Sequence, residues 1–193
     1  FENTLDKNID FNNLMNKDII LINEVEEFSS GLINSLNNFT KNGGSIAIFP
    51  PKKIDITNYN ISLNELGIAT FSTLKTQKNL LEDINIEHPI YKHVFEGKLD
   101  KINFPEIKKY YPIISRKNSN SIALLTQENK AVFLSVYSKE KGSIYLFNSP
   151  LNIEFNNFSK HALFVPTLIN IATSSIRTES IYNTISPEDY FTS

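Results

Sequence analysis

The chain has 193 residues and a mass of 22.0 kDa, a length that predicts one domain with a substantial buried core. Its 19 basic and 21 acidic side chains give a net charge of −2, and only two of the basic residues are arginine, so we expect no nucleic-acid partner. The absence of cysteine excludes a disulfide framework, a thiolate zinc site and a cysteine nucleophile.

The first fifty residues predict a strand–helix–strand unit. Residues 1–17 are mostly polar and indicate irregular structure or a short helix, and the apolar run at 18–23 is typical of a strand buried on both faces. Ser29 or Ser30 is suited to cap a helix that ends at Gly43 and Gly44, because glycine adopts the left-handed conformation that ends helices. Residues 45–49 predict a second strand, parallel to the first.

The middle of the chain is predicted to consist mainly of strands. Residues 57–67 favour a short helix, and residues 88–95 favour a turn followed by one helical turn. Short apolar or alternating runs bounded by turn residues predict further strands. These strands are expected at residues 68–74, 80–86, 108–115, 121–125, 131–137 and 143–147.

A last helix is predicted over residues 159–176, with Pro166 at a kink or at the helix start. It is apolar over more than half of its circumference, which is typical of a helix that is largely buried. Residues 1–176 are therefore expected to form one domain, and the polar residues 177–193 a tail or a linker to a following domain. Because the chain begins with Phe1 rather than methionine, we expect it to be a piece of a longer protein.

Several short segments resemble a known family. They are Ile20-Leu-Ile-Asn-Glu24, Ser30-Gly-Leu, Asn42-Gly-Gly-Ser-Ile-Ala-Ile-Phe-Pro50, His88-Pro-Ile, Gly142-Ser-Ile-Tyr-Leu-Phe-Asn-Ser-Pro-Leu151 and His161-Ala-Leu-Phe-Val-Pro166. The segments are similar to class I glutamine amidotransferase-like domains. They resemble more closely the soluble domain of BatA-type bacterial membrane proteins, whose N-terminus is a pair of transmembrane helices. The resemblance covers residues 18–176.

The resemblance implies a flavodoxin-like α/β three-layer sandwich with an added β-rich part. It also implies a position on the extracytoplasmic, periplasmic side of a bacterial cell envelope, with membrane anchoring through segments outside this chain. The first strand of the amidotransferase-like sheet is not apparent, so either the chain starts after it or residues 1–17 replace it. Class I amidotransferases use a cysteine, a histidine and a glutamate. This chain has no cysteine and no Gly-x-Ser-x-Gly elbow, so the resemblance carries over no activity.

Five residues are candidates for a ligand-binding site at the carboxyl ends of the strands, where open α/β sheets bind ligands. Asn23 and Glu24 end the first strand, and Pro50 follows the second. Ser149 follows the last strand, and His161 lies near the start of the last helix. Ser149 as nucleophile, His161 as base and Glu24 as the orienting carboxylate form the catalytic set that the sequence offers. The alternative is that Glu24 is a loop residue, Ser149 is a loop serine that caps, and His161 is a histidine at a helix end.

Other motifs favour structural roles. Gly43 and Gly44 lie after a helix rather than before one, so a phosphate-binding loop is not expected. His88 and His93 lack the i, i+4 spacing of a helical metal pair, and we predict no metal site and no cofactor. The tyrosine and phenylalanine side chains of the strands are expected to lie mainly in the core, the alternative being a surface for a partner.

The sequence therefore predicts a non-catalytic domain of a membrane-anchored envelope protein, with a protein partner in the envelope and a role in interaction or assembly. One alternative is a hydrolase or transferase with a non-cysteine nucleophile, and another is a small-molecule or glycan sensor. The enzyme alternative requires Glu24, Ser149 and His161 to lie within hydrogen-bond reach in a pocket.

Overall fold

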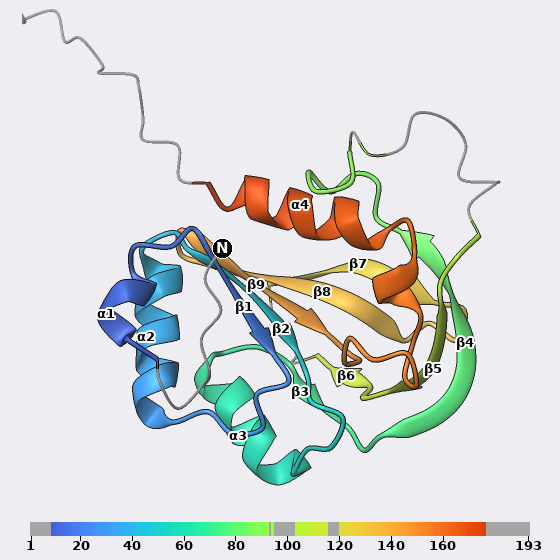
Figure 1. Ribbon diagram of the computed structural model, residues 1–193, viewed down its shortest axis with the longest axis horizontal. Helices are drawn as coiled ribbons and strands as arrows, with labels where there is room; N and C mark the ends of the chain where they lie inside the picture. The colour runs from blue at the N-terminus through green and yellow to red at the C-terminus, as the bar shows by residue number, and fades with distance from the viewer. Residues whose placement is uncertain (1–8, 93, 95–102, 116–119, 177–193) are drawn as a thin grey trace, which may run out of the picture.

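A seven-stranded mixed sheet, in the order β1-β2-β9-β8-β7-β4-β5, runs through the molecule (Figure 1). The computed structural model describes residues 9–92, 94, 103–115 and 120–176. Neighbouring strands β1, β2 and β9 are parallel, and the other neighbouring pairs are antiparallel. The strands are β1 (Ile19–Asn23), β2 (Ser45–Phe49), β4 (Lys75–Ile84), β5 (Glu106–Tyr110), β7 (Ser121–Gln127), β8 (Val132–Lys139) and β9 (Gly142–Phe147).

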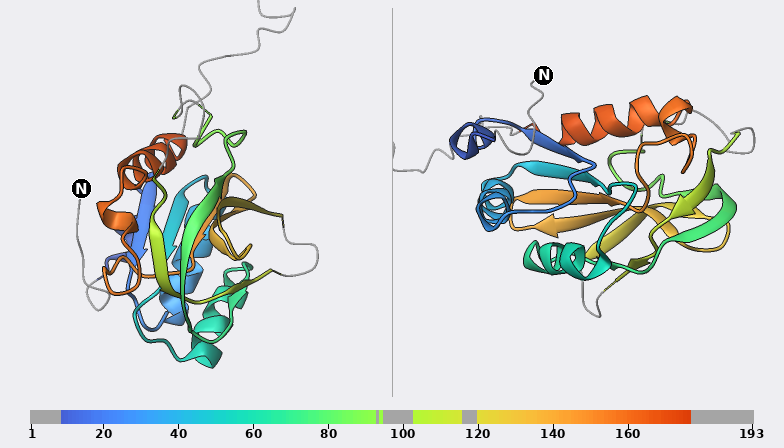
Figure 2. Two further views of the ribbon diagram at one scale, coloured as in Figure 1. Left: turned by 90° about the vertical axis from the view of Figure 1, so that its right-hand side faces the viewer. Right: turned by 60° about the horizontal axis from the view of Figure 1, so that its bottom comes forward.

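Helices cover both faces of this sheet, which confirms the predicted α/β sandwich (Figure 2). On one face lie α1 (Phe11–Leu14), α2 (Ser30–Lys41) and α3 (Ile56–Glu65), and on the other lie η3 (Phe158–Lys160) and α4 (Phe164–Ser174). A separate two-stranded sheet pairs β3 (Thr70–Phe71) with β6 (Ile113–Ile114). No described helix is both long enough and apolar enough to cross a lipid bilayer.

Local signals produce the predicted β1–α2–β2 unit. The Ser29 hydroxyl oxygen caps α2 by accepting a hydrogen bond from the backbone N–H of Leu32, at 3.2 Å. Leu36 and Phe39 are fully buried against the sheet. Gly43 has a φ of 96°, so the helix ends in the left-handed conformation that its glycine permits.

The strand predictions fail where polar residues or proline interrupt the pattern. β4 begins at Lys75 rather than at residue 80, because its first residues are polar and exposed and give no apolar signal. The predicted strand at 68–74 is only the two residues of β3. The predicted strand at 108–115 is divided at Pro112, whose carbonyl oxygen accepts a bond from Ser72 N at 2.8 Å. Pro112 has no N–H with which to continue a ladder.

Helix α4 differs from its prediction in burial. It begins at Phe164, so Pro166 lies in its first turn, as expected for a helix start. The prediction that the helix is largely buried is wrong, because Val165 is 57% and Ile169 54% exposed. The helix packs on the sheet through the side that carries Thr167 and Ile171. Within the described residues, no further layer covers its outer side.

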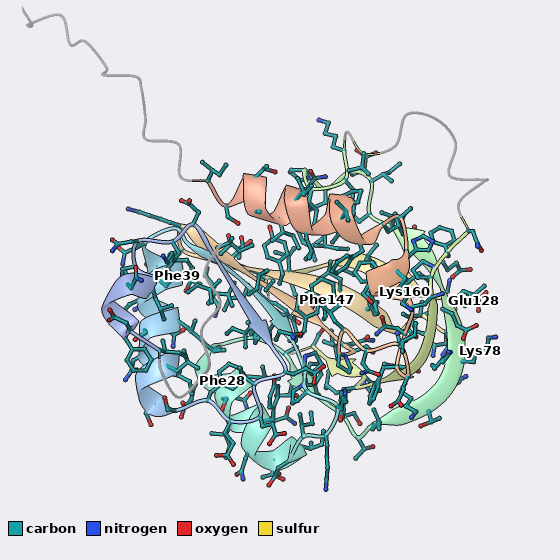
Figure 3. The ribbon with its side chains drawn as sticks, viewed as in Figure 1. Phe28, Phe39, Lys78, Glu128, Phe147 and Lys160 are labelled. Atoms are coloured by element: carbon teal, nitrogen blue, oxygen red, sulfur yellow. The ribbon has the colours of Figure 1, made fainter. Side chains whose placement is uncertain are left out.

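Phenylalanine rings fill the layer between the sheet and α4. Phe49 of β2 stacks on Phe147 of β9 with ring centroids 4.1 Å apart. Phe158 meets Phe133 at 5.1 Å and Phe164 at 5.6 Å, both edge-on. Figure 3 labels Phe147 within this layer, beneath α4. The prediction that the aromatic side chains of the strands are mainly core is therefore confirmed.

Gly142 provides a test of how closely β9 approaches the end of α2. A Cβ at residue 142 would overlap the backbone carbonyl oxygens of Gly44 and of Thr40, the second at 2.6 Å. Because both atoms belong to the backbone, we expect Gly142→Ala to lower the free energy of unfolding by about 2 kcal/mol.

The matched control is Gly31→Ala, whose Cβ meets the Phe11 ring at an ordinary 3.5 Å. Alanine favours a helix over glycine, so this variant should be as stable as the wild type or up to about 1 kcal/mol more stable. Urea unfolding followed by circular dichroism measures both, and equal stabilities of the two variants would contradict the close approach.

Candidate functional site

Four of the five predicted ligand-binding residues lie at the carboxyl ends of the parallel strands. Asn23 ends β1 in register with Phe49 of β2, and its side chain is exposed. Glu24 has a φ of 55° and donates its backbone N–H to the Phe49 carbonyl at 3.1 Å. Pro50 follows β2 and is buried, and Ser149 follows β9 and is also buried. Because β1, β2 and β9 are parallel, these four residues lie at the same end of the sheet.

The Ser149 side chain forms structural hydrogen bonds. Its hydroxyl donates to the Lys109 carbonyl oxygen at 2.8 Å and accepts from the Asn156 amide nitrogen at 2.8 Å. The residue is 1% exposed. A hydroxyl whose proton is given to a backbone carbonyl, and which has almost no access to solvent, is poorly placed to attack a substrate.

His161 is occupied in a different way. Its Nδ1 accepts a hydrogen bond from the backbone N–H of Leu163 at 3.1 Å, and its Nε2 contacts the carbonyl oxygen of Asn103. An acceptor role for Nδ1 leaves the proton of the neutral ring on Nε2, which donates to Asn103. Neither ring nitrogen bonds to Ser149 or Glu24. The structure therefore does not assemble the serine–histidine–carboxylate set, and His161 binds a backbone N–H just before α4, as a histidine at a helix end.

Asn156, which sequence reasoning did not select, organises the loop at residues 148–157. Its amide nitrogen donates to Ser149 Oγ and to the Pro150 carbonyl at 2.7 Å, and its amide oxygen accepts from Phe158 N at 3.0 Å. The side chain is fully buried. The sequence has many asparagines in its predicted loops, and no pattern distinguishes Asn156 from the others. Only the burial of its side chain, which the structure shows, indicates this role.

The same loop pairs with the outer edge of β5 through backbone hydrogen bonds. Lys108 N donates to the Phe155 carbonyl at 2.7 Å, and Asn157 N donates to the Glu106 carbonyl at 3.1 Å. Tyr111 N adds a bond of 2.7 Å to the Asn148 carbonyl. The antiparallel strands therefore curl until the far end of the sheet meets the segment that follows β9, as the bent ribbons of β4 and β5 show (Figure 1).

Tyrosines fill the space beneath the segment that follows β2. The Tyr111 hydroxyl donates to the Lys52 carbonyl at 2.9 Å, and the Tyr59 ring packs edge-on against Phe28 with centroids 5.5 Å apart. Burial raises the pKa of both phenols above the usual range, so they stay neutral at physiological pH. The Tyr59 hydroxyl is buried without a partner among the described residues. This region is thus packed with aromatic side chains.

A groove of about 620 Å³ lies instead beside α4, and none of the five predicted residues lines it. The segment opposite α4 is held to the helix by two side-chain bonds. The Tyr91 hydroxyl pairs with the Thr167 hydroxyl at 2.9 Å, and Asn170 Nδ2 donates to the Ile90 carbonyl at 2.7 Å. The groove is lined by Pro89, Val94, Pro166, Asn170, Thr173 and Ser174.

The described part of the chain contains no cluster of three or more histidine, aspartate or glutamate side chains that could hold a metal ion. The groove beside α4 is lined by no charged side chain. The arrangement can therefore bind an apolar or neutral polar surface, but it brings no acid, base or nucleophile together there.

Several solved structures have a similar architecture. The cytoplasmic protein STM1381 from Salmonella typhimurium LT2 matches with a TM-score of 0.63 and 14% identity, over 85% of this chain and 74% of that chain. A thua-like protein from Bacteroides uniformis matches with a TM-score of 0.59 and 17% identity, over 88% and 74%. The N-terminal domain of mmIFT52 matches with a TM-score of 0.61 and 14% identity, over 89% and 85%.

The fold is that of the class I glutamine amidotransferase-like domains. No protein-family model matches the chain, and no curated protein is similar to it in sequence. At 14–17% identity the similarity shows the fold alone. It confirms the predicted fold class, and it leaves the activity and the partner to be argued from the surface of this chain.

The role of Ser149 can be tested by removing its hydroxyl. Ser149→Ala leaves the Asn156 amide and the Lys109 carbonyl each without one buried bond, so we expect unfolding to become easier by about 1–2 kcal/mol. Asn156→Ala also frees Phe158 N and should cost about 3 kcal/mol.

Ser30→Ala, at an exposed position of α2, is the control and should change stability by less than about 0.5 kcal/mol. Chemical denaturation at neutral pH gives the three free energies. If Ser149→Ala unfolds at the same denaturant concentration as the wild type, the structural role assigned to the hydroxyl is wrong.

Proposed function

We propose that this chain is a non-catalytic, protein-interaction domain of a membrane-anchored bacterial envelope protein of the BatA type. In this proposal the domain lies on the periplasmic side, is anchored by segments outside this chain, and acts in interaction or assembly. The observation that carries the interaction role is the outer side of α4, which is apolar and lacks charge.

No aspartate, glutamate, lysine or arginine occurs between Lys160 and Arg177. Val165, Ile169 and Ile176 are each more than half exposed along this segment. A helix that faces only water normally carries charged side chains on its solvent side. An uncharged stripe of this kind is typical of a surface that is covered by another protein. We call Val165, Ile169 and Ile176 the α4 stripe.

The hydrogen bonds of the predicted catalytic side chains also favour a non-catalytic role. Ser149 holds the Lys109 carbonyl and Asn156, and His161 binds the start of α4. These side chains are therefore used by the fold, and the hydrolase or transferase alternative has no assembled nucleophile and base among the described residues.

A second candidate function is recognition of a small neutral molecule or glycan in the groove beside α4. The groove is large enough, at about 620 Å³, and it offers the amide of Asn170 and the hydroxyls of Thr173 and Ser174. Asn170 already donates to the Ile90 carbonyl, which leaves its oxygen to accept from a ligand. The two candidates differ in what the α4 stripe does, because a small ligand in the groove does not require it.

The interaction function is tested with Ile169→Lys in the full-length protein. A lysine in the α4 stripe must leave water when a partner covers the helix, so we expect partner recovery to fall by about tenfold or more. Ile61→Lys is the matched control, because Ile61 is similarly exposed, at 52%, on α3 across the sheet.

Quantitative cross-linking and co-purification from cells that make each variant provide the measurement. Proteins recovered with the wild type and with Ile61→Lys, but lost with Ile169→Lys, are the expected result. Recovery of the same proteins at the same level with both variants would remove the α4 stripe as the interaction surface.

Anchoring in the envelope is tested separately by fractionation. We expect the full-length protein to stay with the membranes through washes with high salt and alkaline carbonate, because a transmembrane span is not released by breaking electrostatic contacts. We also expect protease added to spheroplasts to digest this domain. Release into the soluble fraction, or protection of the domain in intact spheroplasts, would show that the proposed location is wrong.

A further inference from the structure

The two outer edges of the sheet differ in whether their backbone groups are paired. The outer edge of β5 is paired with the loop at residues 148–157. Within the described ranges, no strand pairs with the outer edge of β1. An exposed strand edge presents a row of unpaired backbone donors and acceptors, which is a template for another extended chain.

The hydrogen bonds of β1 show which backbone groups lie on its free side. The carbonyl of Asp18 accepts from Ser45 N at 3.1 Å, and Glu24 N donates to the Phe49 carbonyl at 3.1 Å. In a parallel ladder alternate residues bond to the same neighbour, so the even-numbered residues of β1 face β2. The N–H and C=O groups directed to the free side belong to Ile19, Leu21 and Asn23.

The side chains of β1 favour an apolar occupant. Leu21 is 40% exposed, although it is in register with the fully buried Ala47 of β2. No charged residue lies within Ile19–Asn23, so the edge has none of the lysine or proline gatekeepers that usually protect an edge strand. An added strand with apolar side chains on the α4 side would cover Leu21.

The residues that follow the carboxyl end of β1 favour a partner with basic side chains. Glu24, Glu26 and Glu27 follow the strand, and no lysine or arginine occurs between Lys17 and Lys41. Glu26 and Glu27 are exposed, and none of the three carboxylates forms an ion pair with another described residue. A partner strand with basic residues at that end would be complementary in charge.

We propose that the free edge of β1 binds an extended segment of a partner protein as an eighth strand, with alternating apolar residues and a basic pair that lies beside Glu24, Glu26 and Glu27. The inference rests on the proposed interaction function and specifies the chemistry of the partner. Backbone hydrogen bonds supply the affinity, and the apolar and basic side chains supply the specificity.

A second copy of this chain fits the edge less well. Two β1 strands paired antiparallel about Leu21 would place Asp18 of one copy opposite Glu24 of the other, at both ends of the pair. Like charges directly opposite one another destabilise a strand pair. The occupant to which we commit is therefore a different chain with basic residues.

Synthetic peptides provide the probe. Val-Thr-Val-Thr-Val-Lys-Lys and Lys-Lys-Val-Thr-Val-Thr-Val, both capped at their ends, place the basic pair beside the glutamates in a parallel and an antiparallel strand, respectively. We expect one of them to bind at least about tenfold more tightly than its counterpart in which glutamate replaces lysine. Fluorescence anisotropy at two salt concentrations measures the affinities, and the preference should shrink at the higher salt.

Leu21→Pro is the sharpest variant, because the N–H that it removes points to the free side and not to β2. We expect it to weaken binding of the basic peptide at least about tenfold while the domain stays folded by circular dichroism. Leu21→Lys, which adds an edge charge that repels the basic pair, is the second variant if the proline variant unfolds. Leu21→Thr keeps the N–H and should lose less affinity than either.

Three results of the peptide assay would overturn the inference. They are binding of neither basic peptide, equal binding of basic and acidic peptides, or unchanged binding by Leu21→Pro and Leu21→Lys. A wild-type dimer in solution that Leu21→Pro converts to monomer would assign the edge to a second copy instead. Ile61→Lys on α3, outside the α4 stripe and outside β1, should leave peptide binding unchanged. Loss of protein partners by Ile169→Lys in the absence of peptide binding would retain the proposed function and reject this inference.

Discussion

The buried amide of Asn156 fixes the half of the molecule in which the antiparallel strands curl. Its nitrogen binds Ser149 Oγ and the Pro150 carbonyl, and its oxygen binds the N–H of Phe158. These bonds shape the loop after β9 so that the loop pairs with the outer edge of β5, at the far end of the sheet. They also set the start of η3, from which Phe158 enters the aromatic layer beneath α4. The fully buried Asn156 side chain therefore links the loop after β9 to the segment that leads into α4.

This closure divides the molecule into a sealed half and an open half. At the β5 end, backbone groups that would otherwise be exposed are paired, and Lys109 lies over the Phe155 ring at 5.3 Å from its centroid. At the β1 end, no strand among the described residues pairs with the outer edge, which is apolar and is followed by an acidic loop. Because an edge that is not protected invites pairing, the open half is where recognition of another chain is physically favoured.

The elements that were predictable from sequence are those whose signals are local. Ser29 and Gly43 define the two ends of α2 through side-chain capping and a left-handed turn, whatever the rest of the chain does. The first half of β4 was missed because Lys75 and its neighbours are exposed and have no apolar periodicity; their strand conformation comes from pairing with β5. The burial of α4 was overestimated because an apolar composition is the same for a helix inside a core and for one with an uncharged outer side.

The chemistry of the candidate site is likewise only partly predictable from the sequence. The position of Ser149 after a strand was predictable from the apolar run at residues 143–147, but its role depends on the Asn156 amide and the Lys109 carbonyl, which the fold brings to its hydroxyl. A serine that donates to a carbonyl and accepts from an amide has no proton left for a base to take. The residues after β9 therefore serve to close the sheet rather than to supply a nucleophile. Once the polar side chains at that end serve the fold, selectivity must come from what remains exposed. In the described part of the chain, the exposed surfaces include the uncharged α4 stripe and the acidic, apolar edge of β1, and both are suited to recognise another polypeptide chain.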